Sequence, residues 1–439
     1  MNVAWSFPTR VAAALLALLL VGVRPAAAQT PSAAVADTIT LSLEEAQRLS
    51  LRQNPQFLAD SREGAIARGQ LRQARLPAFN SQVSLELPGA ANGGGAGEYE
   101  ASLTQEVEWA GQRGARVRAA GFGVQRADLT VRNAARITLG DVSNAYFDTY
   151  AARQRLQLAE ELLDLNEQLL RAVRIQLREG EVSALEANLA EVELGRARAR
   201  VLAARRELTS AELQLKRLTG LSPDQPIRLP GTVPAAAPAP ATGRDSLAAL
   251  ALGRRPDLVA QRTAVLESQA LSDLARREGR PNVAVGVLAR REGDGDPSVG
   301  LGVSVPFPVL NRNQGRLAEQ QARTSQAELQ ARAVELAVRT EVTDALRAYQ
   351  TATEEETVYA ASVLQPTREN RTLLEIAYRE GKIDLATLLL VRNQLLDAEL
   401  GYWDTWQAQR RAQVFLEVAT GASPVLADID DTIGDTDND

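Results

Sequence analysis

The chain has 439 residues, a formal net charge of −6, no cysteine or histidine, and no methionine after Met1. It therefore lacks the thiolate and imidazole ligands that zinc, copper and iron sites usually need. It also lacks disulfides, cysteine nucleophiles and histidine bases. The weak acidic charge gives nucleic-acid binding no electrostatic support. We therefore expect no enzyme activity, no cofactor, no metal site and no nucleic-acid partner.

Residues 1–28 have the pattern of a secretory signal peptide. Arg10 supplies the positive n-region, residues 11–23 form an apolar h-region, and three alanines at 26–28 precede a cleavage point at Gln29. The apolar run is shorter than the ~20 residues that a membrane-spanning helix needs, although an N-terminal anchor helix is the alternative. No later segment has 18 consecutive apolar residues, so we expect no transmembrane helix in the mature chain.

A helix is predicted first, from Leu43 to about Leu76, and two extended segments follow it. In both segments apolar residues alternate with small or polar ones, as in strands with one apolar face. The apolar positions are Val83, Leu85, Leu87, Tyr99, Ala101, Leu103, Val107 and Trp109, and the intervening acids are Glu86, Glu100, Glu106 and Glu108. The strand lengths suit a tilted membrane strand of ~9–11 residues, and a soluble amphipathic hairpin is the alternative.

A very long helix is predicted next, from Ala119 to Arg178, which corresponds to ~90 Å. The apolar residues of a coiled-coil seam follow one another at spacings of four and three: Leu158, Leu162, Leu165, Leu169 and Ala172. The return helix, Ser183 to Leu218, opens with the same spacing at Leu185, Leu189 and Val192. It is too short to cover its partner, so we expect the opening and return helices to stack end to end along the long one.

The second half of the chain repeats the first after a proline-rich linker at 223–241, which should be stiff and extended. Helices are predicted for 247–279, 315–378 and 384–420, with strands at 283–287 and 299–305. An offset of 201 residues relates four pairs of anchors: Arg178-Glu179-Gly180 with Arg379-Glu380-Gly381, Leu218-Thr219-Gly220 with Ala419-Thr420-Gly421, Asn54-Pro55 with Arg255-Pro256, and Gly114 with Gly315. We divide the chain into a first repeat (29–222), the linker, a second repeat (242–421) and an acidic disordered tail (422–439).

Four strands do not close a membrane barrel, because bacterial barrels begin at about eight strands. Open strand edges are not tolerated in lipid. If the sheet enters a membrane, several copies must therefore associate. A dimer would give 8 strands and a trimer 12, and the pattern leaves both open.

Residues 40–421 resemble the TolC family of outer-membrane efflux proteins. The most specific stretches are the two Arg-Glu-Gly turns, each followed by a Leu-rich helix. The run Ser304-Val305-Pro306-Phe307-Pro308-Val309-Leu310-Asn311-Arg312-Asn313-Gln314-Gly315 resembles the CzcC-like branch, which is associated with heavy-metal efflux pumps of the RND type.

The resemblance implies an α+β membrane protein in the outer membrane of a Gram-negative bacterium. It implies a homotrimer with a 12-stranded β-barrel that continues into a periplasmic α-helical coiled-coil barrel, with the linker in an equatorial belt. The function would be passive efflux, with metal cations as candidate substrates, and the partners a periplasmic adaptor (a membrane fusion protein) and an inner-membrane RND pump. Drug efflux or type I secretion, and a pore-free periplasmic adaptor, are the alternatives.

The resemblance also assigns roles to residues. The adaptor-contacting tips would be Arg178, Glu179, Gly180 and Ser183, with Arg379, Glu380, Gly381 and Asp384. The alternative is that the glycines are helix C-caps and that Ser183 and Asp384 are N-caps. Glu186 is a gate candidate, although its counterpart is Thr387 and a solvated helix face explains it equally well.

Four residues are expected at the strand-to-helix turns: Gly114, Pro306, Pro308 and Gly315, because proline cannot continue a strand ladder. If the apolar strand face meets lipid, Glu86, Glu100, Glu106 and Glu108 face the lumen and favour cations. Trp109 and Phe307 are interpreted as interfacial anchors, and Trp403 and Trp406 as packing residues. Acid runs such as Glu44-Glu45 and Glu354-Glu355-Glu356 look like helix-start and surface charges rather than catalytic pairs.

Overall fold

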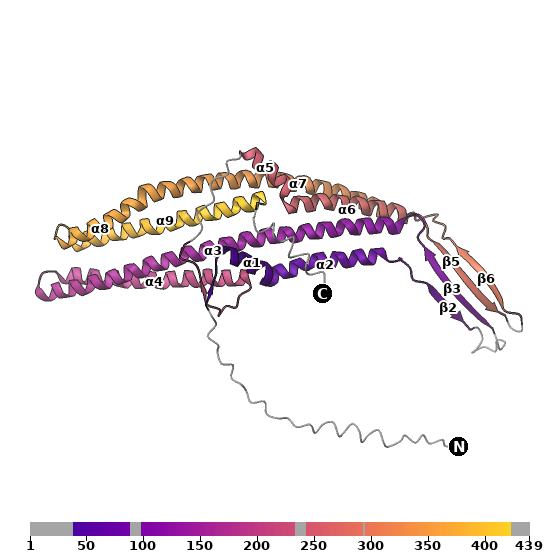
Figure 1. Ribbon diagram of the computed structural model, residues 1–439, viewed down its shortest axis with the longest axis horizontal. Helices are drawn as coiled ribbons and strands as arrows, with labels where there is room; N and C mark the ends of the chain where they lie inside the picture. The colour runs from indigo at the N-terminus through magenta and orange to yellow at the C-terminus, as the bar shows by residue number, and fades with distance from the viewer. Residues whose placement is uncertain (1–37, 88–97, 233–242, 293–294, 423–439) are drawn as a thin grey trace, which may run out of the picture.

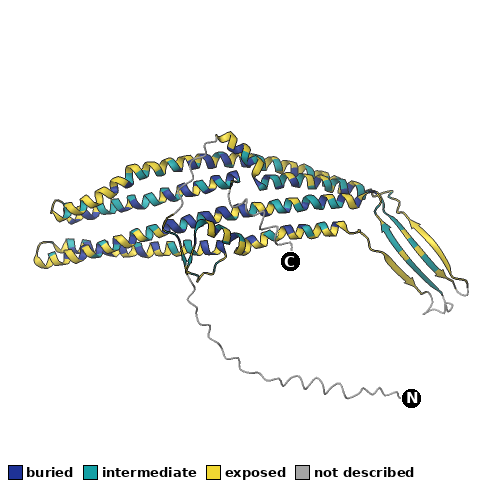
Figure 2. Ribbon diagram, in the orientation of Figure 1, coloured by how far each residue is buried: buried dark blue, intermediate teal, exposed yellow. Residues whose placement is uncertain are grey.

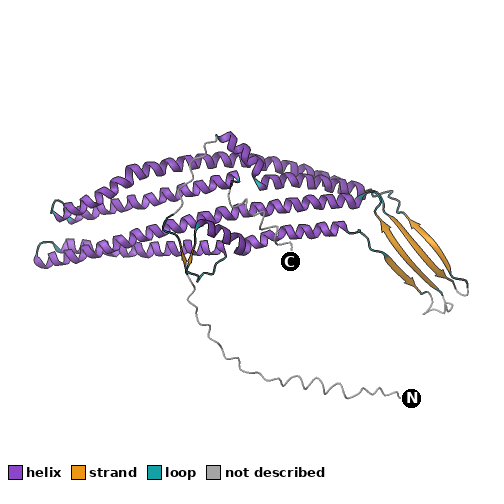
Figure 3. Cartoon of the chain, viewed as in Figure 1, coloured by secondary structure: helices purple, strands orange, loops and turns teal. Residues whose placement is uncertain are grey.

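A computed structural model describes residues 38–87, 98–232, 243–292 and 295–422. The predicted signal peptide, the loop of the first hairpin, the linker from residue 233 onward and nearly all of the tail lie outside these ranges. The described chain is a long bundle of helices with a four-stranded sheet at one end (Figure 1, Figure 3). Among the described helices, none has the length and apolarity needed to cross a membrane.

The same order of elements occurs in both halves. In chain order they are β1 (Ile39–Thr40), α1 (Leu43–Gln53), α2 (Pro55–Arg75), β2 (Gln82–Glu86), β3 (Tyr99–Val107), α3 (Gln112–Glu179), α4 (Ala184–Thr219), β4 (Ile227–Arg228), α5 (Arg244–Arg254), α6 (Pro256–Glu278), β5 (Val283–Arg291), β6 (Ser298–Ser304), α7 (Gln314–Tyr359), the π-helix η1 (Ala360–Leu364), α8 (Gln365–Arg379) and α9 (Leu385–Thr420).

The opening helix of each half is two helices, and the prediction of one continuous helix is wrong in both places. α1 ends at Gln53 and α5 at Arg254, and the residues that follow, Asn54 and Arg255, have extended ψ angles of 113° and 119°. A proline follows each of these residues, and the residue before proline is disfavoured in the helical region. Asn54 then accepts a hydrogen bond from the backbone N–H of Gln56 at 3.0 Å, which caps α2.

The two long helices differ from each other. α3 begins at Gln112, before the predicted Ala119, and its 68 residues correspond to ~100 Å. The predicted continuous helix from Gly315 to Tyr378 is instead interrupted by η1. Pro366 lies just after this π-turn. Because proline has no N–H to donate and its ring crowds the preceding turn, the wider π-turn accommodates it.

The short helices do stack end to end along the long ones, as predicted. α2 and α4 lie along α3, and α6 and α9 lie along α7 (Figure 1). The joint between α4 and α1 is tight. A Cβ on Gly220 would meet the backbone oxygen of Gln53 at 2.3 Å, so only glycine fits this position without a backbone shift.

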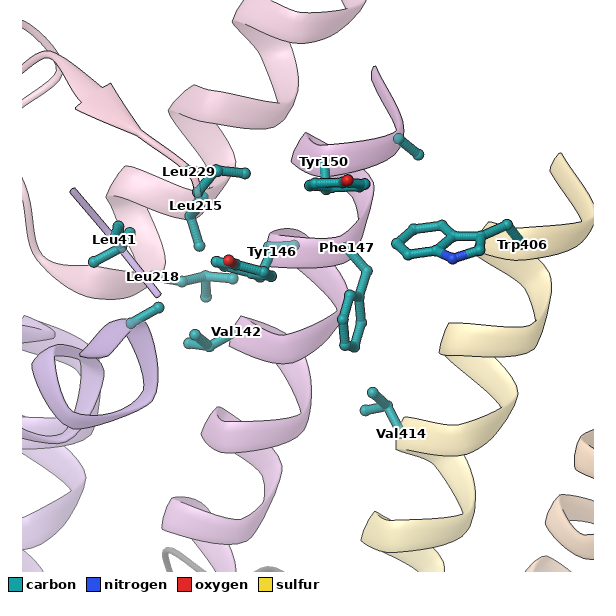
Figure 4. Packing of buried hydrophobic residues seen from close by; sticks show 13 residues of the cluster. Leu41, Val142, Tyr146, Phe147, Tyr150, Leu215, Leu218, Leu229, Trp406 and Val414 are labelled. Carbon is teal, nitrogen blue, oxygen red and sulfur yellow. The ribbon is translucent and has the colours of Figure 1, made fainter. Parts of the chain in front are cut away.

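The largest core clusters lie near the middle of the bundle, where buried residues concentrate (Figure 2). In one of them Tyr146 and Phe147 of α3 pack against Trp406 of α9 and Leu215 of α4 (Figure 4). Trp406 is buried and Trp403 packs against it, so both tryptophans are packing residues as predicted.

The described start of the linker is not a free connector. β4 pairs in parallel with β1, and Leu229 is buried in the same central cluster. These contacts strap residues 223–232 across α3 and α4.

The predicted coiled-coil seams are right only in part. Leu162 and Leu169 are buried, but Ala172 is exposed and Asn166 is buried instead. On α4 the predicted seam residues Leu185 and Val192 are exposed, and Ala187, Ala190 and Leu194 form the buried face. Small residues allow α4 to lie closer to its neighbours than leucines would.

Candidate functional site

The sheet is antiparallel in the order β2-β3-β5-β6, and each of its faces has one chemical character. Val83, Leu103, Val287 and Leu301 lie opposite one another in a row across all four strands. The apolar face they belong to is open: Val83 is 78% exposed and Leu301 87%. An exposed apolar surface of this kind marks contact with lipid or protein.

Both edges of this sheet lack a partner strand within the described chain. β2 and β6 are the outer strands, and their unpaired N–H and C=O groups invite pairing with another strand. The sheet is therefore incomplete by itself.

The opposite face is polar. Glu86 lies directly opposite Glu100 in the register, and Arg290 lies on the other side of Glu100 with a 3.9 Å ion pair. Glu106 shares this face and accepts a hydrogen bond from Asn282 at 2.9 Å. Three of the four predicted lumen acids thus lie together on one face of the sheet.

Glu108, the fourth, lies beyond the end of β3 and is largely covered. Its carboxylate accepts two hydrogen bonds from the Arg116 guanidinium, at 2.6 and 3.0 Å. This ion pair ties the strand end to the first turns of α3. We therefore assign Glu108 a structural role and remove it from the set of free acids on the sheet.

The turns from strand to helix are built differently from the prediction. Gly114 and Gly315 lie inside the first turn of α3 and α7, and the left-handed residues are Gly111 (φ 78°) and Asn313 (φ 62°). Pro306 and Pro308 do lie between β6 and α7. The missed sequence signal is a left-handed residue followed by glutamine, which occurs at Gly111-Gln112 and at Asn313-Gln314. In each case the glutamine side chain accepts a hydrogen bond from the backbone N–H two residues earlier.

The two predicted anchors have different surroundings. Trp109 donates its indole N–H to the carbonyl of Pro281 at 2.7 Å, which joins the first strand-to-helix turn to the second repeat. Phe307 has no such partner among the described residues and is 89% exposed. The anchor role of both remains a prediction.

At the far end of the bundle, the two Arg-Glu-Gly turns have the same backbone geometry. Gly180 (φ 79°) and Gly381 (φ 69°) are left-handed. The N–H of Glu181 bonds to the carbonyl of Gln176, and that of Lys382 to the carbonyl of Ala377, both at 2.9 Å. These are the hydrogen bonds of a Schellman C-cap.

The residues after the turns cap the return helices. Ser183 and Glu186 form a capping box, with the Glu186 carboxylate 2.8 Å from the Ser183 N–H. In the second tip Asp384 accepts a hydrogen bond from the Thr387 N–H at 2.8 Å, and these bonds to Thr387 lower the pKa of Asp384. The capping interpretation is thus confirmed. All eight predicted tip residues are also exposed, so capping leaves them accessible to a partner.

Above the tips, a buried polar layer crosses the bundle, which sequence reasoning missed. Arg392 donates to Asn166 at 2.7 Å, and Asn393 bridges Arg200 and Glu193 at 3.1 and 3.3 Å. Burial lowers the pKa of Arg392. The asparagine in the Leu162-to-Leu169 seam was the available signal, because a polar seam residue commonly specifies helix register.

A second buried cluster holds the C-terminal end of α9. Arg255 pairs with Asp257 at 2.5 Å and with Glu341, while Arg136 lies 3.7 Å from Asp257. Arg136 also donates to the carbonyl of Val418, and Arg255 to that of Ala419 at 3.3 Å. Cations near a helix C-terminus stabilise its unpaired carbonyls.

A groove of about 950 Å³ lies on α3 between α4 and α9. Its floor is mostly alanine, including Ala152, Ala159 and Ala204. Its charged lining residues are Arg155, Arg200, Arg206, Arg411, Asp148 and Glu207. Within the described ranges, no three acidic side chains gather in a way that would hold a metal ion.

Comparison with known proteins agrees with this architecture. The family model for outer membrane efflux proteins matches residues 41–221 and again residues 247–422. A search of curated protein sequences finds no match.

Several solved structures share the fold. CusC, described by its conformational changes during folding and transmembrane channel formation, is 20% identical, with a TM-score of 0.70 over 88% of this chain and 94% of that one. The Campylobacter jejuni CmeC outer membrane channel is 16% identical, with a TM-score of 0.73 over 89% of each chain. The open state of the Neisseria gonorrhoeae MtrE outer membrane channel is 20% identical, with a TM-score of 0.65 over 86% and 88%. Because the family model covers most of the sequence in two consecutive matches, the chain belongs to the outer membrane efflux protein family.

Proposed function

We propose that this protein is the outer-membrane channel of a tripartite efflux system, and that it conducts solute passively without catalysis. One observation supports this most directly. A sheet with an exposed apolar face, a polar face and two open edges stands at one end of a helical bundle whose longest helix extends ~100 Å. If the apolar face contacts lipid and the polar face contacts water, each face of the sheet has a matching environment.

The assembly that we propose is a homotrimer with a 12-stranded barrel. Four strands per copy are too few to enclose a pore, and the open edges of β2 and β6 would be satisfied by pairing with neighbouring copies. Family membership supports three copies. The helices would continue the duct into the periplasm, with β1, β4 and the linker in an equatorial belt.

The proposed partners are a periplasmic adaptor and an inner-membrane RND pump. The adaptor would contact the tips around Gly180 and Gly381, whose residues are exposed and held in a defined shape by the caps. In the first tip the Glu186 carboxylate is already used by the capping box. Glu186 remains our gate candidate, and we propose that it contributes to the gate by holding the shape of the turn.

The substrate class is suggested by one segment of the sequence and by one structural neighbour. The segment from Ser304 to Gly315 resembles the heavy-metal branch, and CusC is among the structural neighbours. However, Asn313 and Gln314 in that segment have a structural role at the start of α7. Metal cations are our proposed substrate, and drug efflux or type I secretion is the second candidate.

The test is assembly and conduction. The mature chain, extracted from outer membranes in detergent, should run as a trimer that dissociates on heating. It should also form discrete channels in a planar bilayer. A chain that is monomeric and soluble without detergent would instead fit the pore-free adaptor and would contradict the proposal.

A further inference from the structure

We propose that the acidic C-terminal segment of this chain, residues 423–439, docks into the groove between α4 and α9. The occupant is part of the same polypeptide, so the inference concerns a single copy and does not depend on trimer formation. It rests on the shape and charge of the groove, on the composition of the segment, and on the distance between them.

The groove could bind a segment that has small apolar side chains and acidic residues beside them. Its alanine floor leaves about 950 Å³ open between two helices. Four arginines and two acids line it, a balance of 4 − 2 = +2. Arg155 is paired with Glu207 and with Asp404, and Arg411 with Asp148, whereas no ion pair involves Arg206 anywhere in the described ranges.

The C-terminal segment has the complementary composition. It contains six aspartates, at positions 428, 430, 431, 435, 437 and 439, and no basic residue. These six charges equal the whole formal net charge of the chain, −6. Opposite charges in a partly shielded groove attract more strongly than on an open surface.

The segment also contains three large apolar residues. Leu426, Ile429 and Ile433 follow one another at intervals of three and four. Burial of these side chains on the alanine floor would add to the ionic attraction.

The distance is short enough for docking. α9 ends at Thr420, and the nearest groove residue on that helix, Arg411, lies nine residues earlier, or ~14 Å along the axis. The 17 residues after Ala422 span up to ~55 Å when extended. The segment therefore reaches back over the groove with length to spare.

The groove lies on a different face of α3 from the one covered by β1, β4 and residues 223–232, which we call the strap. Tyr146 and Val142 of α3 pack under β1 and α4 in the central cluster. The groove instead uses Ala145, Asp148, Ala152 and Arg155, about a third of a turn away around the helix. In the proposed duct, docking would thus place the acidic segment on a different side of α3 from the strap.

The absence of cysteine makes a labelling experiment direct. Ala203→Cys adds one thiol on an exposed groove position, and Leu213→Cys adds one on the same helix outside the groove. We expect maleimide to react with the first thiol at least fivefold more slowly in the full chain than in a chain ending at Ala422. The second thiol should react equally in both.

The second experiment tests whether protection of the Ala203→Cys thiol depends on ionic attraction. In the full chain, 0.5 M NaCl or Arg206→Glu should restore at least half of the lost reactivity, because both weaken the ionic attraction. Arg347→Glu, on the exposed surface of α7, is the matched control and should leave protection unchanged. Equal reactivity with and without the segment would overturn the inference. Protection that persists after truncation would also overturn it, since a second copy or another protein would then be the occupant. Trimer and channel formation by the truncated chain is read separately and tests only the proposed function.

Discussion

Asp257 shows how one residue joins the two repeats, because Arg136 belongs to α3 of the first repeat and Arg255 and Glu341 belong to the second. Its carboxylate lies between Arg255 and Arg136, both nearly buried, and Arg255 also contacts Glu341. Burial alone would raise the pKa of Asp257, but hydrogen bonding and charge from Arg255 outweigh it and lower the pKa. In the first repeat, Asn54 occupies the position of Arg255, so this ionic joint has no counterpart there.

Asp257→Asn should therefore destabilise the folded protein in a pH-dependent way. A lowered folded-state pKa means that the charged form stabilises the fold above the unfolded value of ~3.9 and that this contribution is lost as the pH falls. We expect a loss of about 2 kcal/mol at pH 7, since the pair is only partly covered. Thermal unfolding of both proteins, followed by circular dichroism of the helices at pH 7 and pH 3, measures this loss of stability. Asp245→Asn, at a 90% exposed side chain, is the control. A difference from wild type that is as large at pH 3 as at pH 7 would contradict this assignment.

Glu86 and Glu100 largely set the charge of the polar face of the sheet. Like charges placed directly opposite each other destabilise a sheet, yet here the pair is tolerated beside one arginine, Arg290. With Glu106, the polar face carries three acids against that arginine, a balance of 1 − 3 = −2 per copy.

We accordingly predict mild cation selectivity for the assembled channel. The double change Glu86→Gln and Glu100→Gln should move the reversal potential in a KCl gradient toward zero. Glu108→Gln should leave the reversal potential nearly unchanged, because that carboxylate is held by Arg116. Anion preference in the wild-type channel would rule out the assigned face.

At the scale of the element, helix ends explain most of the recognisable sequence repeats. Gly180, Gly220, Gly381 and Gly421 all have positive φ angles and follow the C-terminal ends of helices. Two of the four anchor pairs that recur at an offset of 201 residues are thus helix stop signals, which are readable from sequence because few residues tolerate left-handed geometry.

Two of these glycines differ in their surroundings, and this difference is testable. At Gly180 an added Cβ meets nothing within 4 Å, so Gly180→Ala should cost only the ~1–2 kcal/mol of left-handed strain. At Gly220 the same Cβ meets the Gln53 backbone oxygen at 2.3 Å, so Gly220→Ala should lower the melting temperature clearly further. Similar melting temperatures for the two variants would show that the α1–α4 joint relaxes freely.

Seams were less predictable than helix ends. Leu185 and Val192 have seam spacing but are exposed, and alanines form the buried side of α4. Several alternative faces of a Leu- and Ala-rich helix have acceptable spacing, and the neighbouring helices select one of them. The π-turn at Ala360–Leu364 was likewise not predicted, although Pro366 marks a local problem for a regular helix.

For the whole molecule, the sequence by itself determined the order of the main helices and strands, the strand alternation and the two Arg-Glu-Gly turns, because these depend on local periodicity and on glycine geometry. It also determined the end-to-end stacking, since helix lengths follow from residue counts.

Only the tertiary structure decided which polar residues meet. It brought Arg136 to Asp257 and Arg392 to Asn166, and it removed Glu108 from the open sheet face by placing Arg116 beside it. It also formed the groove between α4 and α9. These contacts join residues far apart in the chain, and their geometry depends on how the long helices pack against one another, which no local pattern records.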